Sequence, residues 1–144
     1  MHNYSTKTIL LFTSKQLFDI VIDVKSYPLF LPWCLSSKII NKKNNYNFDA
    51  ILNVGLKAID EKYTSRIEAV EALKVRSYAI SGPFNHLESI WNFNDQINNT
   101  CEVSFNIEYE FKSFFLDKIM GGMFKNATIK MLKAFETRAN QLYN

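Results

Sequence analysis

The chain of 144 residues contains only four glycines, three prolines, two cysteines and two histidines. So little glycine and proline excludes a collagen-like or low-complexity chain. The 47% hydrophobic content predicts a packed globular protein instead. A chain of this length buries a sizeable core without disulfides or metals. We therefore expect a single domain over residues 1–144.

The scarcity of cysteine and histidine also limits the chemistry of the chain. Cys34 and Cys101 are far apart and form no CxxC pair or Cys/His cluster, which argues against a zinc site or a redox motif. We expect two buried, free thiols. His2 lies in a terminus that we expect to be frayed, and His86 has no predictable partner. Because the sequence also lacks a nucleophile motif and a phosphate loop, we predict no metal site and no catalytic residue.

Long apolar runs are missing as well. No stretch approaches the roughly 18 consecutive apolar residues of a membrane-spanning helix, and the N-terminus lacks the layout of a signal peptide. We therefore expect a soluble, cytoplasmic protein. The net charge of +3 permits an acidic partner, such as a nucleic acid or a membrane surface, without requiring one.

Hydrophobic periodicity predicts a helix near the N-terminus, followed by a series of strands. After a first strand at 4–12, Ser14 as N-cap begins an amphipathic helix that Pro28 ends by about Ser26. Apolar and polar residues then alternate as in half-buried antiparallel strands. These strands are expected at about 46–59, 62–71, 73–81, 86–94 and 100–111.

The chain closes with a helical pattern over residues 113–143. Gly121 and Gly122 interrupt this pattern, and two glycines in a helix interior cost about 2 kcal/mol relative to alanine. We therefore predict a break or kink there, after a short leading helix. The order of elements predicts an α+β fold in which a curved antiparallel sheet grips the last helix. The Met and Phe stripe of that helix fits either plain core or the wall of a ligand cavity.

Four segments resemble a known family when they are taken together and in order. They read "SYPLFLPWC" at 26–34, "SGPFNHLESIWNF" at 81–93, "EVSFNIEYEFKS" at 102–113 and "AFETRANQLY" at 134–143. This combination resembles the coenzyme Q-binding family of the START-like (polyketide cyclase/dehydrase-like) superfamily, whose bacterial members include proteins named ribosome association toxin. The resemblance implies a helix-grip fold around an elongated hydrophobic cavity that holds ubiquinone or a related polyisoprenoid lipid.

The resemblance also implies where such a ligand would lie. Pro28 and Pro32 would restrain the backbone, so that Phe30 and Trp33 form a stiff wall at the cavity mouth. The alternative is that these aromatic residues only seal the first helix against the sheet. We expect the ligand to be lined by Phe30, Trp33, Phe84, Leu87, Trp91, Phe105, Tyr109, Met120, Phe124 and Met131.

A ring-bearing lipid needs a way into such a cavity. Gly121 and Gly122 fall where the helix would cross the open end of the sheet, and we expect them to form a gate together with Pro28 and Pro32. Arg66, in the segment "YTSRI", has either a functional role or a place in a surface salt bridge. The expected function is that of a lipid carrier that supports respiratory electron transport, with no resident cofactor and with peripheral contact to the inner membrane.

Two other functions stay open. A factor like the ribosome association toxins would bind the large ribosomal subunit and block subunit association, and Lys125, Lys130 and Lys133 are its candidate contacts. Their spacing around the helix argues against one compact basic stripe. An aromatic polyketide cyclase would need an acid and a base in the cavity, and the sequence predicts neither there. DNA is not an expected partner.

Overall fold

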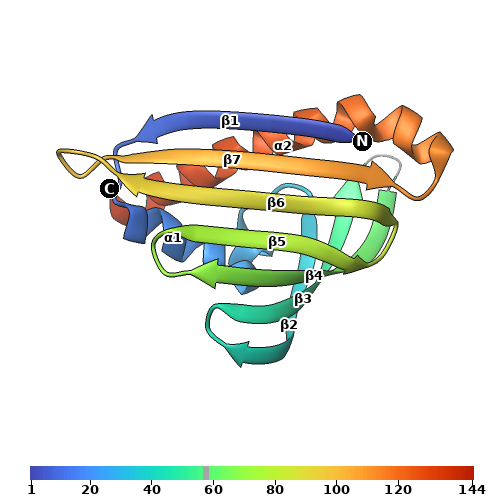
Figure 1. Cartoon of the computed structure of the whole chain (residues 1–144), viewed down its shortest axis with the longest axis horizontal. Coiled ribbons are helices and arrows are strands. Elements are labelled where there is room, and N and C mark those ends of the chain that lie inside the picture. Colours follow the sequence, from blue (N-terminus) through green and yellow to red (C-terminus); the bar gives the residue numbers. More distant parts are fainter. Residues whose placement is uncertain (57–58) are drawn as a thin grey trace.

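Seven antiparallel strands form one curved sheet, and a long C-terminal helix packs behind it (Figure 1). The computed structural model describes residues 1–56 and 59–144. The strand order is β1-β7-β6-β5-β4-β3-β2. The predicted α+β helix-grip architecture is confirmed. The elements are β1 (His2–Leu10), α1 (Ser14–Ile22), the 3-10 helix η1 (Val24–Leu29), β2 (Cys34–Asn44), β3 (Asn47–Leu56), β4 (Ile59–Val70), β5 (Lys74–Ser81), β6 (Phe84–Asp95), β7 (Cys101–Phe111) and α2 (Phe114–Tyr143).

A capping box begins α1, and its N-cap is Thr13 instead of the predicted Ser14. The Thr13 hydroxyl accepts the N–H of Gln16 at 3.2 Å, and the Gln16 side chain accepts the N–H of Thr13 at 2.9 Å. Ser14 donates its hydroxyl to Asp95 of β6 at 2.7 Å. Both residues are good N-caps. The predicted N-cap was one residue too late. The hydroxyl of Ser14 bonds to Asp95, which is distant in the sequence, so it does not cap the helix.

The chain leaves α1 earlier than predicted, at Ile22, and continues as η1 through Pro28. The α-helix does end before Ser26, but Pro28 is not the cause, because it lies inside the 3-10 helix that follows. The N–H groups of Phe30 and Leu31 both bond to the carbonyl of Tyr27, so the segment stays helical although Pro28 lacks a donor. The Tyr27 hydroxyl donates to the carbonyl of Val21, which ties η1 back to α1.

The sequence analysis did not predict β2, which forms one edge of the sheet. Its residues "CLSSKIINKKN" show no regular alternation, and most of their side chains are exposed. Lysines on an edge strand prevent unwanted pairing with other chains. The pairing of β2 with β3 is irregular, with register shifts near both of its ends. An edge strand of this kind lacks the periodic signal that identifies half-buried strands.

The last helix, α2, is continuous through Gly121 and Gly122, so the predicted break is wrong. A Cβ atom built on Gly121 would lie 2.6 Å from Cε1 of the His2 ring. The Gly121 carbonyl also accepts the hydroxyl of Tyr109 at 2.7 Å. Close packing between α2 and β1 therefore explains the first glycine. Gly122 has open space where its side chain would be.

The N-terminal residues are part of the sheet, so the expectation of a frayed His2 is also wrong. His2 pairs with Tyr109 in the register of β1 and β7, and its ring stacks on the Tyr109 ring at 4.9 Å. Its Nε2 lies 3.0 Å from Oδ2 of Asp117, at the start of α2. His2 therefore joins β1, β7 and α2 at one end of the molecule.

The main core lies between the inner face of the sheet and the two helices. Both cysteines are buried and free, as predicted. Burial raises the pKa of the Cys34 thiol to about 11. Within the described residues, no helix is both long and apolar enough to cross a bilayer.

We expect alanine to have opposite effects at the two glycines of α2. Gly122→Ala should raise the free energy of unfolding by up to about 1 kcal/mol, because alanine is the better helix former and nothing crowds the methyl group. Gly121→Ala should lower it, because the methyl group pushes the His2 ring off Tyr109. Urea unfolding measures both changes. Adding His2→Ala to Gly121→Ala should recover part of the loss, and equal effects at both glycines would contradict this account.

Candidate functional site

A cavity of about 90 Å³ lies between the inner face of the sheet and the middle of α2. A buried water needs about 10–15 Å³ of such space, so the cavity has room for one ring but not for a long chain. Most of its wall is apolar. The lining residues are Val24, Tyr27, Trp33, Leu52, Val54, Leu56, Tyr63, Ser65, Ile67, Val75, Ser77, Tyr78, Ala79, Phe84, Leu87, Ser89, Trp91, Phe105, Ile107, Phe124, Ala127, Thr128, Met131 and Phe135.

Small inward-facing residues on three adjacent strands help to create this space. Ser65 of β4, Ser77 of β5 and Ser89 of β6 all line the cavity. Ser77 lies directly opposite Ser89 in the strand register, and Ser65 opposite Ala79. Successive side chains of a strand point to opposite faces, so these small residues occupy positions where large apolar ones would fill the core. We call the three serines the hydroxyl floor.

The hydroxyl floor also carries hydrogen-bonding capacity. The hydroxyl oxygens of Ser77 and Ser89 lie 2.7 Å apart. Each hydroxyl donates one hydrogen bond, so a bond between them leaves one proton of the pair for a ligand acceptor. Sequence reasoning missed this floor because an inward serine on β5 looks like any polar residue until the register with β6 is known.

Two other hydroxyl groups of the wall, those of Thr128 and Tyr27, already donate within the protein. Thr128 donates to the carbonyl of Phe124 at 2.9 Å within α2, and Tyr27 donates to Val21. Burial raises the pKa of Tyr27 and of Tyr63, so both phenols stay neutral. Among the described residues that line the cavity, none is Asp, Glu, His, Lys or Arg. The cavity therefore lacks an acid–base pair.

The structure brings seven of the ten predicted ligand-lining residues into the wall of this cavity. They are Trp33, Phe84, Leu87, Trp91, Phe105, Phe124 and Met131. Phe105 and Trp91 face each other on β7 and β6, and Phe124 and Met131 face them from α2. Alternation in the strands and helical spacing in α2 had placed these side chains on the correct faces.

The other three predicted residues do not line the cavity. Phe30 packs edge-to-face on Phe135 at 5.3 Å, so it seals η1 against α2, which is the alternative role left open for it. Tyr109 uses its hydroxyl to hold Gly121, and Met120 is completely buried in the core. Tyr109 and Met120 are buried, as their positions in the periodic pattern predict, but neither lines the cavity.

None of the four predicted gate residues, Pro28, Pro32, Gly121 and Gly122, lines the cavity. Of the run 26–34, Tyr27 and Trp33 line the cavity, whereas Pro28 lies in η1 and Pro32 is exposed. Gly121 is held by packing against His2, which gives it a structural role without a hinge. The gate itself stays a prediction.

A second cavity, of about 340 Å³, lies on the β1 side of α2. It shares Trp91, Phe105 and Phe135 with the first cavity. The Trp91 ring lies 4.7 Å from that of Phe105 and 5.0 Å from that of Phe135. These three rings, which we call the aromatic partition, separate the two spaces. The remaining lining residues are Thr6, Thr8, Leu10, Leu17, Ile20, Val21, Phe93, Val103, Leu132, Lys133 and Glu136.

Arg66 lies away from both cavities, opposite Asp49 in the register of β4 and β3. Its Nε donates to Oδ1 of Asp49 at 3.0 Å, and Asn41 donates to Oδ2 at 3.2 Å. Asp49 is only 3% exposed. The hydrogen bond from Arg66 lowers the pKa of Asp49. Of the two roles proposed for Arg66, the structure shows the salt bridge.

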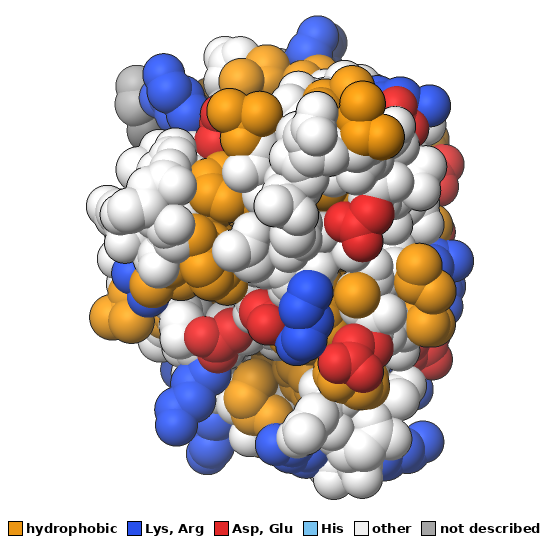
Figure 2. Space-filling model, turned by 90° about the vertical axis from the view of Figure 1, so that its left-hand side faces the viewer, with side chains coloured by type: hydrophobic (Ala, Val, Ile, Leu, Met, Phe, Trp, Pro, Cys, Tyr) orange, Lys and Arg blue, Asp and Glu red, His pale blue; other side chains and the backbone are white. Residues whose placement is uncertain are grey.

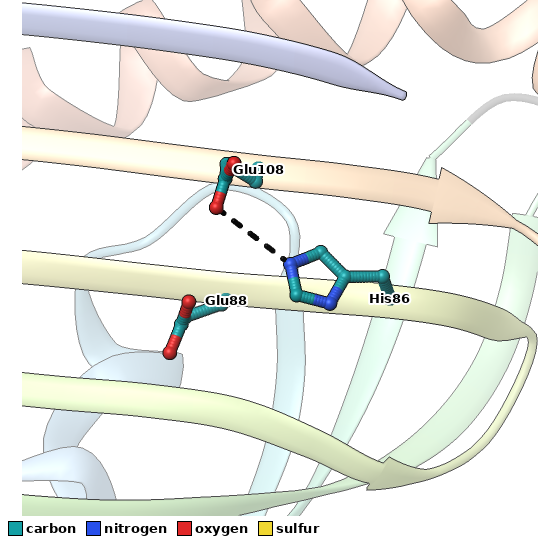
Figure 3. Close-up of side chains that lie close together, drawn as sticks. All are labelled: His86, Glu88 and Glu108. Carbon is teal, nitrogen blue, oxygen red and sulfur yellow. Dashed lines mark ion pairs between the residues drawn. The ribbon is translucent and has the colours of Figure 1, made fainter.

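His86, Glu88 and Glu108 form a cluster on the outer face of β6 and β7 (Figure 3). His86 Nε2 lies 3.8 Å from Oε1 of Glu108, so His86 has a partner that the sequence did not predict. One ligand atom from each residue lies within 4.8 Å of the others, a spacing that a metal ion could use. Arg76 already donates to Glu88 at 2.5 Å, and its positive charge opposes a cation there.

The lysines proposed for ribosome contact are all exposed on α2. Lys125 reaches over the ring of Tyr4 on β1, whereas Lys133 lies at the second cavity beside Glu136. Figure 2 shows the end of the molecule that carries α1 and the turn between β6 and β7, where basic side chains are scattered among acidic and apolar ones. Among the described residues that this view shows, the basic side chains form no continuous patch.

Known proteins are similar to this chain in sequence and in fold. Residues 12–136 match the family model described as polyketide cyclase / dehydrase and lipid transport. A protein of Rickettsia prowazekii named ribosome association toxin RatA is 40% identical over 148 residues, which cover 99% of each chain. The mitochondrial coenzyme Q-binding protein COQ10 homolog B of Xenopus laevis is 35% identical, over 97% of this chain and 59% of that protein. A START superfamily structure from Mycobacterium smegmatis has a TM-score of 0.85 at 16% identity, over 99% of both chains, which shows the fold alone.

The cavity predicts different tolerance to a larger side chain at two inward positions. Ala79 lines the cavity, so Ala79→Leu should change the free energy of unfolding by less than about 1 kcal/mol, because the added atoms enter empty space. Ala50 is fully buried but lines neither cavity, so Ala50→Leu should cost about 1–3 kcal/mol through overpacking. Urea unfolding of both variants gives the comparison. A similar loss at both positions would mean that the cavity is filled in solution.

Proposed function

Because this chain belongs to the polyketide cyclase/dehydrase and lipid transport family, we propose that it binds ubiquinone or a related polyisoprenoid quinone in its cavity. It acts as a carrier that keeps such a lipid out of water and supports respiratory electron transport. The family membership agrees with the resemblance that the sequence motifs predicted. The name of the Xenopus laevis relative, a coenzyme Q-binding protein, supports the choice of ligand.

The single observation that carries this proposal is the hydroxyl floor beneath an aromatic wall. A quinone ring is flat and apolar but has carbonyl oxygens at its edges, so it needs both ring contacts and a hydrogen-bond donor. Trp91 and Phe105 supply the first, and the pair of Ser77 and Ser89 supplies the second. A plain core would have large apolar side chains at these inward positions.

The polyisoprenoid tail needs more room than the first cavity offers. Burying a methylene group contributes about 0.8 kcal/mol, so ten of them give roughly 8 kcal/mol before ordering costs. The second cavity, of about 340 Å³, begins on the other side of the aromatic partition. A turn of the partition rings would let the tail pass from one space to the other.

The lining residues favour binding over catalysis. The family description includes cyclases and dehydrases, which need groups that transfer protons or polarise a carbonyl. The described lining residues of the first cavity are aliphatic, aromatic or neutral hydroxyl side chains, with no charged group among them. We therefore propose that the chain has no enzymatic activity, and an aromatic polyketide cyclase is the least supported alternative.

Tryptophan fluorescence provides a direct test, because both tryptophans of the chain line the cavity. A short-chain ubiquinone should quench this fluorescence saturably. The double variant Ser77→Ala/Ser89→Ala should weaken quinone binding by about 0.5–1.5 kcal/mol, because a hydrogen bond to the ring carbonyl is lost. A phenyl analogue with the same chain but no carbonyls should bind both proteins equally.

Ser104→Ala is the matched control, because Ser104 lies on β7 between the inward residues Val103 and Phe105 and so points away from the cavity. It should leave quinone binding unchanged. Quenching that does not saturate, or that is the same in all variants, would remove the hydroxyl floor from the binding site.

A second function is supported by a different observation, the name of the Rickettsia prowazekii relative. In this alternative the chain binds the large ribosomal subunit and blocks subunit association. Lys125→Gln, Lys130→Gln and Lys133→Gln together should then abolish co-sedimentation with large subunits, and added salt should do the same to the unchanged protein. Respiration rescued in a host that lacks its quinone carrier, with no ribosome binding at near-physiological salt, would contradict the alternative.

A further inference from the structure

The first turns of α2 expose apolar side chains that the fold does not use. The side chain of Phe114 is 83% exposed, that of Phe115 70% and that of Ile119 45%. Phenylalanine is usually buried, so two adjacent exposed rings are a costly feature on a soluble surface. We call these three residues the apolar ridge. In Figure 1 it begins where α2 leaves β7, at the end opposite the turn between β6 and β7.

Packing on the other side of the helix forces the apolar ridge outward. Asp117 accepts the N–H of Phe111 at 3.0 Å and lies 3.0 Å from the His2 ring, and Met120 is completely buried. These contacts fix the rotation of α2 about its axis. Phe114 and Phe115 therefore face solvent, because the helix cannot rotate to turn them inward without breaking these contacts.

The outward charges of the stretch that carries the apolar ridge, residues 112–125, have one sign. Lys112, Lys118 and Lys125 are exposed, and Asp117 is the one acidic residue between Lys112 and Lys125. Because Asp117 turns inward to the Phe111 N–H and His2, the outward charges of this stretch are positive. A second copy of the chain on this surface would set lysines against lysines. A bilayer with anionic headgroups complements both the rings and the charges.

We propose that the apolar ridge docks the protein on the surface of an anionic lipid bilayer, with Phe114 and Phe115 in the interface and Lys112 and Lys118 on the headgroups. This inference rests on the proposed function, because a carrier must meet the membrane that holds its ligand. The apolar ridge also lies at the end of the molecule that is close to cavity-lining residues. Phe111, three residues before Phe114, packs on the cavity-lining rings of Phe84 at 4.8 Å and Phe124 at 5.8 Å.

Co-sedimentation with vesicles tests the docking. The unchanged protein should sediment with vesicles of phosphatidylglycerol and phosphatidylcholine, and less with phosphatidylcholine alone. The double variant Phe114→Ser/Phe115→Ser should lose at least tenfold in affinity. Lys112→Gln/Lys118→Gln should lose mainly the preference for the anionic vesicles and the sensitivity to salt.

The chain offers a matched control at the opposite end. Leu11 and Ile97 are each 81% exposed, but they lie beside the end of β1 and in the β6–β7 turn, away from the ridge. Leu11→Ser/Ile97→Ser should bind vesicles like the unchanged protein. Circular dichroism should show the same melting in all variants, because none of these side chains is part of the core.

The outcomes separate this inference from the proposed function. Loss of vesicle binding in the Phe114/Phe115 variant, with unchanged quenching by a short-chain ubiquinone, would support the docking surface. If vesicles bind through the ridge but the quinone does not bind at all, the docking stands and the proposed function fails. Equal loss in the control variant would overturn the docking. Self-association in sedimentation equilibrium that the Phe114/Phe115 variant abolishes would also overturn it in favour of a second copy.

Discussion

The ring of Phe135 is the contact through which α2, η1 and the sheet hold one another. It lies 5.0 Å from Trp91, 5.3 Å from Phe30 and 5.4 Å from Tyr27, in edge-to-face arrangements. Aromatic pairs of this kind contribute about 0.5–1.5 kcal/mol each beyond their buried area. The same ring forms part of the wall of both cavities. The contacts that stabilise the fold therefore also set the size of the space inside it.

The interior is dense toward the start of α2 and hollow in the middle. Toward the start of α2, the rings of Tyr109, Phe111 and Phe124 pack within 4.3–6.3 Å of one another. In the middle, Ser77 and Ser89 leave a gap where close packing is the rule for protein interiors. A gap of this kind lowers stability, since large side chains there would bury more apolar surface. A binding role would explain why this gap is present despite its cost in stability.

The outer face of the sheet carries charged side chains that form ion pairs. Glu88 and Glu108 lie directly opposite each other, which is an unfavourable pairing of like charges. Arg76 bonds to Glu88 and also to Glu68, and His86 lies near Glu108, so the repulsion is reduced locally. These ion pairs lie on half-buried to exposed side chains at the surface of the sheet and contribute little to stability. Because successive side chains of a strand point to opposite faces, these charged side chains lie on the side of the sheet away from the cavity.

The sequence by itself determined the order of the elements, the family and the faces of the long strands and of α2. These features depend on local periodicity and on motifs such as the run at 26–34, which a single sequence carries in full. It also placed Trp33, Trp91, Phe105 and Phe124 in the cavity wall. It failed for β2, because an irregular, lysine-rich edge strand has no periodic signal.

Only the tertiary structure decided which inward residues line empty space and which fill the core. Periodicity gives Tyr109 and Phe105 the same face, yet Tyr109 is used to hold Gly121 and Phe105 lines the cavity. Ser77 acquired a role only when the register set it opposite Ser89. Gly121 looked like a hinge until His2, about 120 residues away, was found against it. In each case the deciding neighbour is distant in the sequence, and local patterns carry no information about such contacts.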